Sequence, residues 1–142
     1  MSQISKREKV TSDYVTELKS KEEKEPIANF LGMRLLELSP GYAKVVMQMI
    51  PSYQNFNGFI FGGIIMALAD QAFAYASNSL AYPSLASQFN IHFVSSAGVN
   101  DELTAECRVV TSKRRVGVSE MTVTNQDGKL IAKATGTTIP VG

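Results

Sequence analysis

The sequence has few of the residues from which proteins build disulfides, zinc sites and nucleic-acid surfaces. Its 142 residues include one cysteine, one histidine and no tryptophan. One cysteine excludes an internal disulfide framework, and a single cysteine with a single histidine is too few for a zinc site built from these residues. The formal net charge is +1, with no basic face or recognition motif. We therefore expect no metal and no nucleic-acid partner.

The apolar segments that mark secreted and membrane proteins are also missing. The N-terminus is highly charged rather than basic and then apolar, which predicts neither a signal peptide nor a membrane span. We expect a cytoplasmic protein with no membrane partner. A hydrophobic content of 44% and a charged content of 19% are ordinary for globular domains, and the length suits one domain with a substantial core.

The chain divides near Pro26. Residues 1–25 are a charged N-terminal segment, in which Val10, Tyr14 and Leu18 are spaced four residues apart. This spacing predicts a short helix with one narrow apolar stripe. Residues 26–142 then form the domain itself, because the residue before a proline is biased away from helix and marks a boundary.

Alternating apolar and polar residues predict β-strands on both sides of a helical stretch. Two strands precede it, at residues 33–38 and 42–50, with turn residues between them. After it, residues 85–94, 103–111, 116–124 and 130–139 are strand-like and have short antiparallel connections. This order predicts an α+β fold in which a single curved antiparallel sheet wraps around one long central helix.

The stretch between the two groups of strands is residues 55–79, NFNGFIFGGIIMALADQAFAYASNS. Glycine and asparagine crowd its first nine positions, where the backbone must turn sharply, and good helix formers follow from Gly62. Only Asp70 and Gln71 interrupt the apolar residues at positions 64–76. A helix without a polar stripe is typical of a core, so we expect it to be fully buried.

Two features of this helix predict chemistry. No side-chain cap precedes Gly62 and Gly63, so their amides point outward at the positive end of the helix dipole, which suits an oxyanion or a polarised carbonyl. Asp70 is a carboxylate among apolar residues, where a charged group needs partners or a shifted pKa. It is a candidate for a functional acid or base. The alternative is a structural aspartate bonded to backbone or facing an interface.

These residues form a motif, Asn55-x-x-Gly58-x-x-Phe61-Gly62-Gly63 followed by Ala69-Asp70. It resembles the N-x-x-G-x-x-H-G-G and A-D signature of the hotdog-fold acyl-CoA thioesterases, in particular the phenylacetyl-CoA thioesterase type, over about residues 26 to 140. The resemblance implies the hotdog fold. It also implies that Asp70 is the nucleophile or general base, that the Gly62 amide polarises the thioester carbonyl, and that Asn55 helps to place the attacking water.

The sequence departs from the family pattern at two positions. Phe61 replaces the usual histidine, and a family hydroxyl on the strand after the helix falls on or near Ala86, with Ser87 beside it. Loop aromatics such as Phe61 line an acyl pocket in one interpretation and only pack down in the other. The basic residues after position 112 are candidates for the phosphates of coenzyme A. The expected substrate-binding residues are Gly58, Phe61, Gly63, Ser87, Arg114 and Arg115.

The leading hypothesis is a thioesterase that hydrolyses an aryl- or medium-chain acyl-CoA without a separate cofactor. The alternative is a non-catalytic acyl-CoA-binding protein, a sensor or carrier, because Phe61 replaces the histidine. A hotdog hydratase would need histidine at Tyr75, and a Ser-His-Asp hydrolase would need a motif around His92.

A shared site follows from helix geometry. Eight residues separate Gly62 from Asp70, which is ~12 Å along a helix, too far for both to act on one thioester. We therefore expect a homodimer or homotetramer with active sites shared between subunits.

Overall fold

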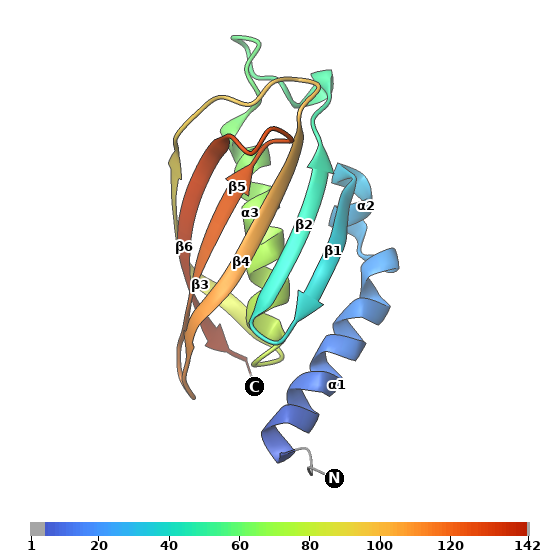
Figure 1. The fold of residues 1–142 in the computed structure, drawn as a ribbon, viewed down its shortest axis with the longest axis vertical. Coiled ribbons are helices and arrows are strands. Elements are labelled where there is room, and N and C mark those ends of the chain that lie inside the picture. The colour runs from blue at the N-terminus through green and yellow to red at the C-terminus, as the bar shows by residue number, and fades with distance from the viewer. Residues whose placement is uncertain (1–4, 142) are drawn as a thin grey trace.

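The computed structural model describes residues 5–141, which form one antiparallel sheet with a long helix against it (Figure 1). Strand order across the sheet is β1-β2-β4-β5-β6-β3. The strands are β1 (Met33–Ser39), β2 (Tyr42–Gln48), β3 (Ser84–Phe93), β4 (Glu102–Ser112), β5 (Gly117–Thr124) and β6 (Leu130–Pro140). The α-helices are α1 (Lys6–Lys21), α2 (Pro26–Leu31) and α3 (Gly62–Asn78), with 3-10 turns η1 (Glu22–Lys24) and η2 (Pro51–Tyr53).

This architecture confirms the predicted α+β hotdog fold. Each expected strand is present, although β2 ends at Gln48 because Pro51 and the turn η2 follow closely. Along the sequence, β1 and β2 come first, followed by α3 and then by the four strands that complete the sheet. The long helix therefore packs on one face of a sheet whose strands come from both sides of it in the sequence.

Helix α1 begins with a capping box. The Glu8 amide donates to the Ser5 hydroxyl (3.1 Å), and the Ser5 amide donates to the Glu8 carboxylate (2.9 Å), which satisfies two otherwise unpaired amides. Leu18 is buried near the other end of the helix, and the Tyr14 ring lies against Tyr82 (5.8 Å between centroids). These contacts attach α1 to the domain beside β1 (Figure 1).

Helix α3 is anchored to the sheet by its buried face. Leu68, Ala69, Ala72 and Ala76 have no exposed area, and Phe73 is almost completely buried. The small residues let the helix approach the strands closely. Its last turn is fixed as well, because the Gly41 amide in the β1–β2 turn donates to the buried Ser79 hydroxyl (2.8 Å). These contacts fix the rotation of α3 about its axis.

The expectation that α3 is buried on all sides is wrong for the single chain. A second face of the helix, carrying Gly63, Met66, Asp70 and Ala74, is exposed. These positions are three to four residues apart and so lie on one side of the helix. The sheet covers only the opposite side, and an apolar exposed face of this kind marks an interaction surface.

Strand β3 forms one edge of the sheet and carries large exposed side chains. Leu85 and Phe93 are 61% and 51% exposed, and Val94, directly after the strand, is 56% exposed. Its pairing with β6 shifts between Ala86 and Gln88, so that Ser87 has no opposite residue. An apolar sheet edge is a ready template for a further strand.

The ring of Phe73 leaves no room for a side chain at Gly136 on β6. A Cβ added at this glycine would lie 2.6 Å from two carbons of the ring, which is enclosed by the core. We expect Gly136→Ala to lower the free energy of unfolding by about 1–3 kcal/mol, the usual cost of overpacking. Urea unfolding measures this loss, and Phe73→Leu should reduce it by making room. An equal loss in both backgrounds would mean that the ring is not the cause.

Candidate active site

The loop before α3 is organised by Asn55. The amides of Asn57 and Phe59 donate to its side-chain oxygen (2.9 and 3.1 Å), and the Gly58 amide donates to its backbone carbonyl (3.0 Å). Gly58 adopts a left-handed conformation (φ 81°), which favours glycine. The structure therefore shows Asn55 and Gly58 holding the loop in shape, and this shape positions the residues that start the helix.

The N-terminus of α3 carries no side-chain cap. Phe61 occupies the cap position, and its ring lies over Gly63, where an added Cβ would be 2.6 Å from the ring. The ring of Phe93, from β3, lies beside Gly62. A Cβ added at Gly62 would be 3.2 Å from this ring. A hollow of about 270 Å³ surrounds Gly62 and includes Phe93 and Ser95. Two aromatic rings thus flank the helix terminus, where the first amides remain available to a ligand.

Asp70 lies on the exposed face of α3. Within residues 5–141 its carboxylate forms no hydrogen bond or ion pair. Although the side chain is exposed by area, its neighbours on the helix are Met66, Phe73 and Ala74, which offer no hydrogen bonds from their side chains. This desolvation raises the pKa of Asp70 above the ordinary value for an aspartate. The carboxylate is therefore more basic than one in water.

A cavity of about 280 Å³ lies between Asp70 and β3. Ala86 lines it, at the position where the family hydroxyl was expected, but Ser87 does not. The Ser87 hydroxyl instead donates to the Thr137 carbonyl (3.2 Å). The β-bulge at Ser87 explains this. A bulge adds one residue to the strand, so the alternation between the two faces of the sheet is shifted by one position between the residues before Ser87 and those after it.

Ser84 is a residue of this cavity that the sequence analysis missed. It is 7% exposed, and its hydroxyl has no hydrogen-bond partner among the residues that the structure describes. A buried hydroxyl without a partner costs stability, so its presence in a cavity beside a carboxylate marks it as a candidate ligand contact. The only signal in the sequence is a serine two positions before Ala86.

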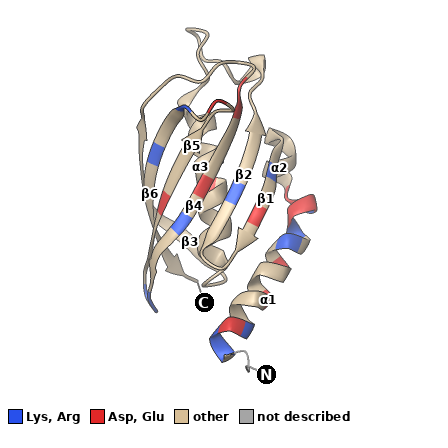
Figure 2. Cartoon of the chain, in the orientation of Figure 1, with Lys and Arg blue, Asp and Glu red and all other residues tan. Residues whose placement is uncertain are grey.

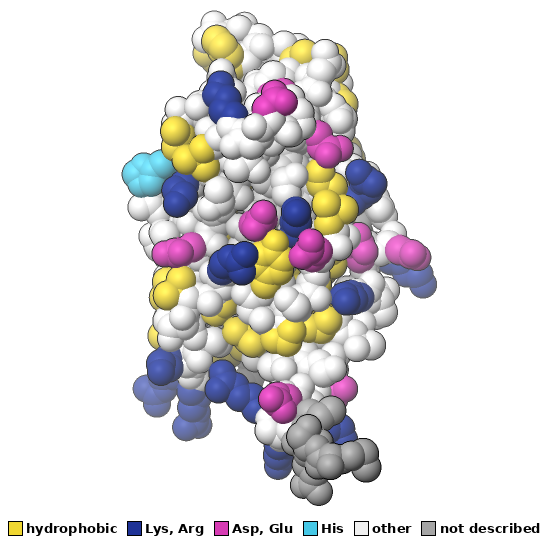
Figure 3. All heavy atoms as spheres, in the orientation of Figure 1, with side chains coloured by type: hydrophobic (Ala, Val, Ile, Leu, Met, Phe, Trp, Pro, Cys, Tyr) yellow, Lys and Arg dark blue, Asp and Glu magenta, His cyan; other side chains and the backbone are white. Residues whose placement is uncertain are grey.

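Arg114 and Arg115 lie in the hairpin between β4 and β5. The strand that follows starts at Gly117, which pairs with Thr138, and Thr138 in turn pairs with Ala86. Both Thr138 and Ala86 line the Asp70 cavity, so the hairpin leaves the sheet at the end nearest this cavity. Lysine and arginine residues gather at this lower end of the molecule (Figures 2 and 3).

The remaining candidates for chemistry do not contribute to this site. His92 is exposed on β3 and shares a shallow groove with Glu120 and Lys133. Burial raises the pKa of the Cys107 thiol to about 12, so it remains protonated and is not a nucleophile. The described part of the chain contains no group of three or more metal-ligating side chains. None of the helices in residues 5–141 is long and apolar enough to cross a membrane.

Gly62 and Asp70 belong to separate hollows within one chain. Gly62 lies in the hollow with Phe93, whereas Asp70 lies in the cavity with Ala86 and Ser84. Both are on α3, eight residues apart, which corresponds to ~12 Å along the helix. A single chain therefore presents an amide donor and a basic carboxylate that do not converge.

Comparison with known proteins identifies the relatives of this chain. Residues 57–132 match the model of the thioesterase superfamily, which is more than half of the chain. An Escherichia coli K12 protein, acyl-coenzyme A thioesterase PaaI, is 32% identical over 84% of this chain and 86% of its own. The structure of E. coli PaaI superimposes with a TM-score of 0.85 over 94% of this chain and 95% of that chain.

Two further similar structures contain coenzyme A compounds. A Streptococcus mutans protein bound to acetyl CoA is 30% identical, with a TM-score of 0.75 over 78% of this chain and 89% of its own. A Streptococcus pneumoniae protein described as a thioesterase with coenzyme A is 25% identical, with a TM-score of 0.79 over 87% of this chain and 96% of that one.

The match to the thioesterase superfamily over more than half of the chain, on a hotdog fold, identifies the class of protein as a thioester hydrolase. The matches to the family model and to relatives along most of the chain agree with this class. The chain belongs to the thioesterase superfamily and is a hotdog-fold thioesterase of the PaaI type. This confirms the resemblance seen in the sequence.

The raised pKa of Asp70 predicts a cost to stability. The folded protein holds this proton more tightly than the unfolded chain, so stability falls as pH rises from the ordinary to the raised pKa and stays lower above it. We expect Asp70→Asn to raise Tm at pH 7, with a gain that shrinks as the pH falls from the raised pKa to the ordinary aspartate pKa and is lost below it. Thermal scans from pH 3 to 8 measure this, with Asp13→Asn on the exposed side of α1 as the control. A lower Tm for Asp70→Asn at pH 7 would contradict it.

Proposed function

We propose that the protein hydrolyses an aryl- or medium-chain acyl-CoA to the free acid and coenzyme A. The observation that carries this proposal is the basic carboxylate of Asp70, which lines a cavity on a thioesterase fold. The relative PaaI is named as an acyl-coenzyme A thioesterase, and two similar structures hold coenzyme A or acetyl CoA. These support coenzyme A as the thiol part of the substrate.

In this mechanism Asp70 acts on the thioester carbon. As a general base, its carboxylate takes a proton from water while the water oxygen bonds to the carbonyl carbon. As a nucleophile, the carboxylate bonds to that carbon itself, and water then hydrolyses the resulting anhydride. In both cases the carbonyl oxygen becomes negative, the carbon–sulfur bond breaks, and the thiolate leaves and takes up a proton. The Gly62 amide donates to the developing oxyanion.

The amide and the carboxylate in one site come from two subunits. The face of α3 with Asp70 and Met66 is exposed, and the neighbouring edge strand β3 presents Leu85 and Phe93. Pairing of this edge with a second copy would cover both apolar surfaces. A twofold axis there would bring the Gly62 end of one helix toward Asp70 of the other and create two equal sites. Such dimers can pair again into tetramers.

The other predicted site residues surround these two groups. Phe61 and Phe93 provide apolar contacts at the helix terminus, where Asn55 and Gly58 fix the loop and Gly63 allows the Phe61 ring to approach. Arg114 and Arg115, on the exposed hairpin near the Asp70 cavity, would bind the phosphates of coenzyme A. Ser84 is better placed than Ser87 to contact the substrate, because Ser84 is among the residues that line the cavity and its hydroxyl is not bonded elsewhere within residues 5–141.

Thiol release from a panel of acyl-CoA substrates tests the proposal. We expect activity on aryl- and medium-chain acyl-CoA, and we expect Asp70→Asn to reduce kcat/KM ~10²-fold or more because the amide cannot act as a base. Asp127→Asn, in the exposed β5–β6 turn, is the matched control. Hydrolysis by Asp70→Asn at the wild-type rate would remove this residue from the mechanism. If the wild type binds acyl-CoA without releasing thiol, the chain is a sensor or carrier.

Mixed dimers test the shared site. Gly62→Pro deletes the amide donor, whereas Gly62→Ala adds a Cβ beside Phe93 and keeps the amide. We expect Gly62→Pro and Asp70→Asn each to be inactive alone and their mixture to regain activity, because a mixed dimer contains one site with an intact amide and an intact carboxylate.

Three comparisons make the mixing experiment decisive. Gly62→Ala should retain more activity than Gly62→Pro, which separates the lost amide from the added bulk. Mixed dimers confirmed by mass spectrometry that remain inactive would count against sharing. Full activity of a monomeric wild type would exclude it.

A further inference from the structure

A second cleft, larger than the Asp70 cavity, lies beneath α1, next to the exposed face of α3. Its volume is about 520 Å³, against about 280 Å³ for the Asp70 cavity, and it is within the range of small-molecule sites, about 300–1,000 Å³. Leu18, Tyr75 and Tyr82 provide most of its apolar lining, with Ser20 and Lys21 on the side of α1. None of these residues has a role in the mechanism above.

The cleft adjoins the Asp70 cavity along α3. Both are lined by Ala74 and Asn78, which therefore lie between the two spaces. The Asn78 side chain is held toward β3, because it accepts from the Ser84 amide (2.8 Å) and donates to the Ala74 carbonyl (2.8 Å). What separates the two spaces is therefore the exposed methyl group of Ala74, one helical turn beyond Asp70.

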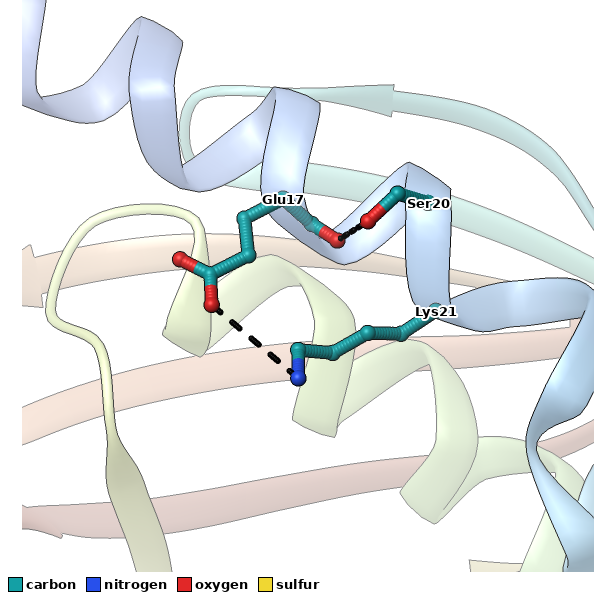
Figure 4. Close-up of polar contacts among 3 residues, drawn as sticks. All are labelled: Glu17, Ser20 and Lys21. Carbon is teal, nitrogen blue, oxygen red and sulfur yellow. Dashed lines mark hydrogen bonds and ion pairs between the residues drawn. The ribbon is translucent and has the colours of Figure 1, made fainter.

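Three polar residues of the cleft, Ser20, Lys21 and Glu25, already have partners within the protein. The Ser20 hydroxyl donates to the Glu17 carbonyl (2.6 Å), and the Lys21 ammonium lies 4.0 Å from the Glu17 carboxylate (Figure 4). The Glu25 carboxylate accepts from Gln71 and from the Tyr75 hydroxyl. A ligand in the cleft would therefore gain most from its apolar surface.

We propose that this cleft is the acyl pocket of the enzyme, in which the acyl group of a thioester held at Asp70 crosses Ala74 and lies between Leu18, Tyr75 and Tyr82. The inference rests on the proposed function and adds the part of the chain that selects the acyl group. One helical turn is ~5.4 Å, so an acetyl group ends before the cleft, whereas an aryl or medium-chain acyl group enters it. Helix α1 is then the outer wall of the pocket.

A matched pair of variants on α1 tests this assignment. Ser20 and Thr16 are both exposed, and each donates its hydroxyl only to the backbone of its own helix, but only Ser20 lines the cleft. Ser20→Trp should fill the cleft and lower the ratio of kcat/KM for phenylacetyl-CoA and octanoyl-CoA to that for acetyl-CoA about tenfold or more, the usual discrimination of an apolar pocket. Thr16→Trp should leave this ratio within twofold of the wild-type value.

Ala74→Phe provides a second block, because its side chain would stand between the two spaces and no residue within 5–141 packs over that exposed position. It should lower the same ratio. Folded variants at both positions that keep the wild-type ratio would overturn the acyl pocket while leaving the hydrolase intact. A wild type that hydrolyses none of these thioesters would overturn the proposed function instead, and the pocket with it. Altered inhibition by free octanoate with an unchanged ratio would assign the cleft to a free acid and also overturn the proposal.

Discussion

The direction in which Asp70 points is the constraint on which the rest of the site depends. This carboxylate has no bonds of its own within residues 5–141 to orient it, so its direction is set by the packing of the opposite side of α3. Leu68 and Ala72 have no exposed area, and the Phe73 ring is held against Gly136. Because these contacts fix the rotation of the helix, they place Asp70 on its exposed side, at the cavity beside β3.

The sequence predicts the fold well because its periodicities are strong. Alternation marks each strand, and the two glycines mark the start of α3. Burial of α3 is predicted less well, because Met66 and Ala74 are apolar but exposed, and hydropathy does not tell a face covered by the chain's own sheet from one left for another partner. The sequence thus predicts an apolar helix correctly, but it does not predict whether the sheet or another partner covers each side of that helix.

The motif identifies Gly62 and Asp70, but it does not predict which neighbours reach them. A β-bulge at Ser87 changes the direction of the side chains before it, and such an insertion leaves no mark in the alternation. Ser84 consequently lines the cavity where Ser87 was expected. The cleft under α1 is lined by Leu18 together with Tyr75 and Tyr82, which lie more than fifty residues further along the chain. Long-range packing of this kind has no local signature.

Three unsatisfied groups lie on α3 or on the neighbouring strand β3, in the two hollows described above, and their placement has a physical explanation. Asp70 is desolvated, the Ser84 hydroxyl is unpaired within the described chain, and α3 begins without a side-chain cap. By contrast, Asn55 and Asn78 have their side-chain oxygens fully engaged by backbone amides. Each unsatisfied group lowers the stability of the free protein, as is common at functional sites. Groups fixed in place by packing need no reorganisation when charge develops in the substrate, so the lost stability is recovered in the transition state.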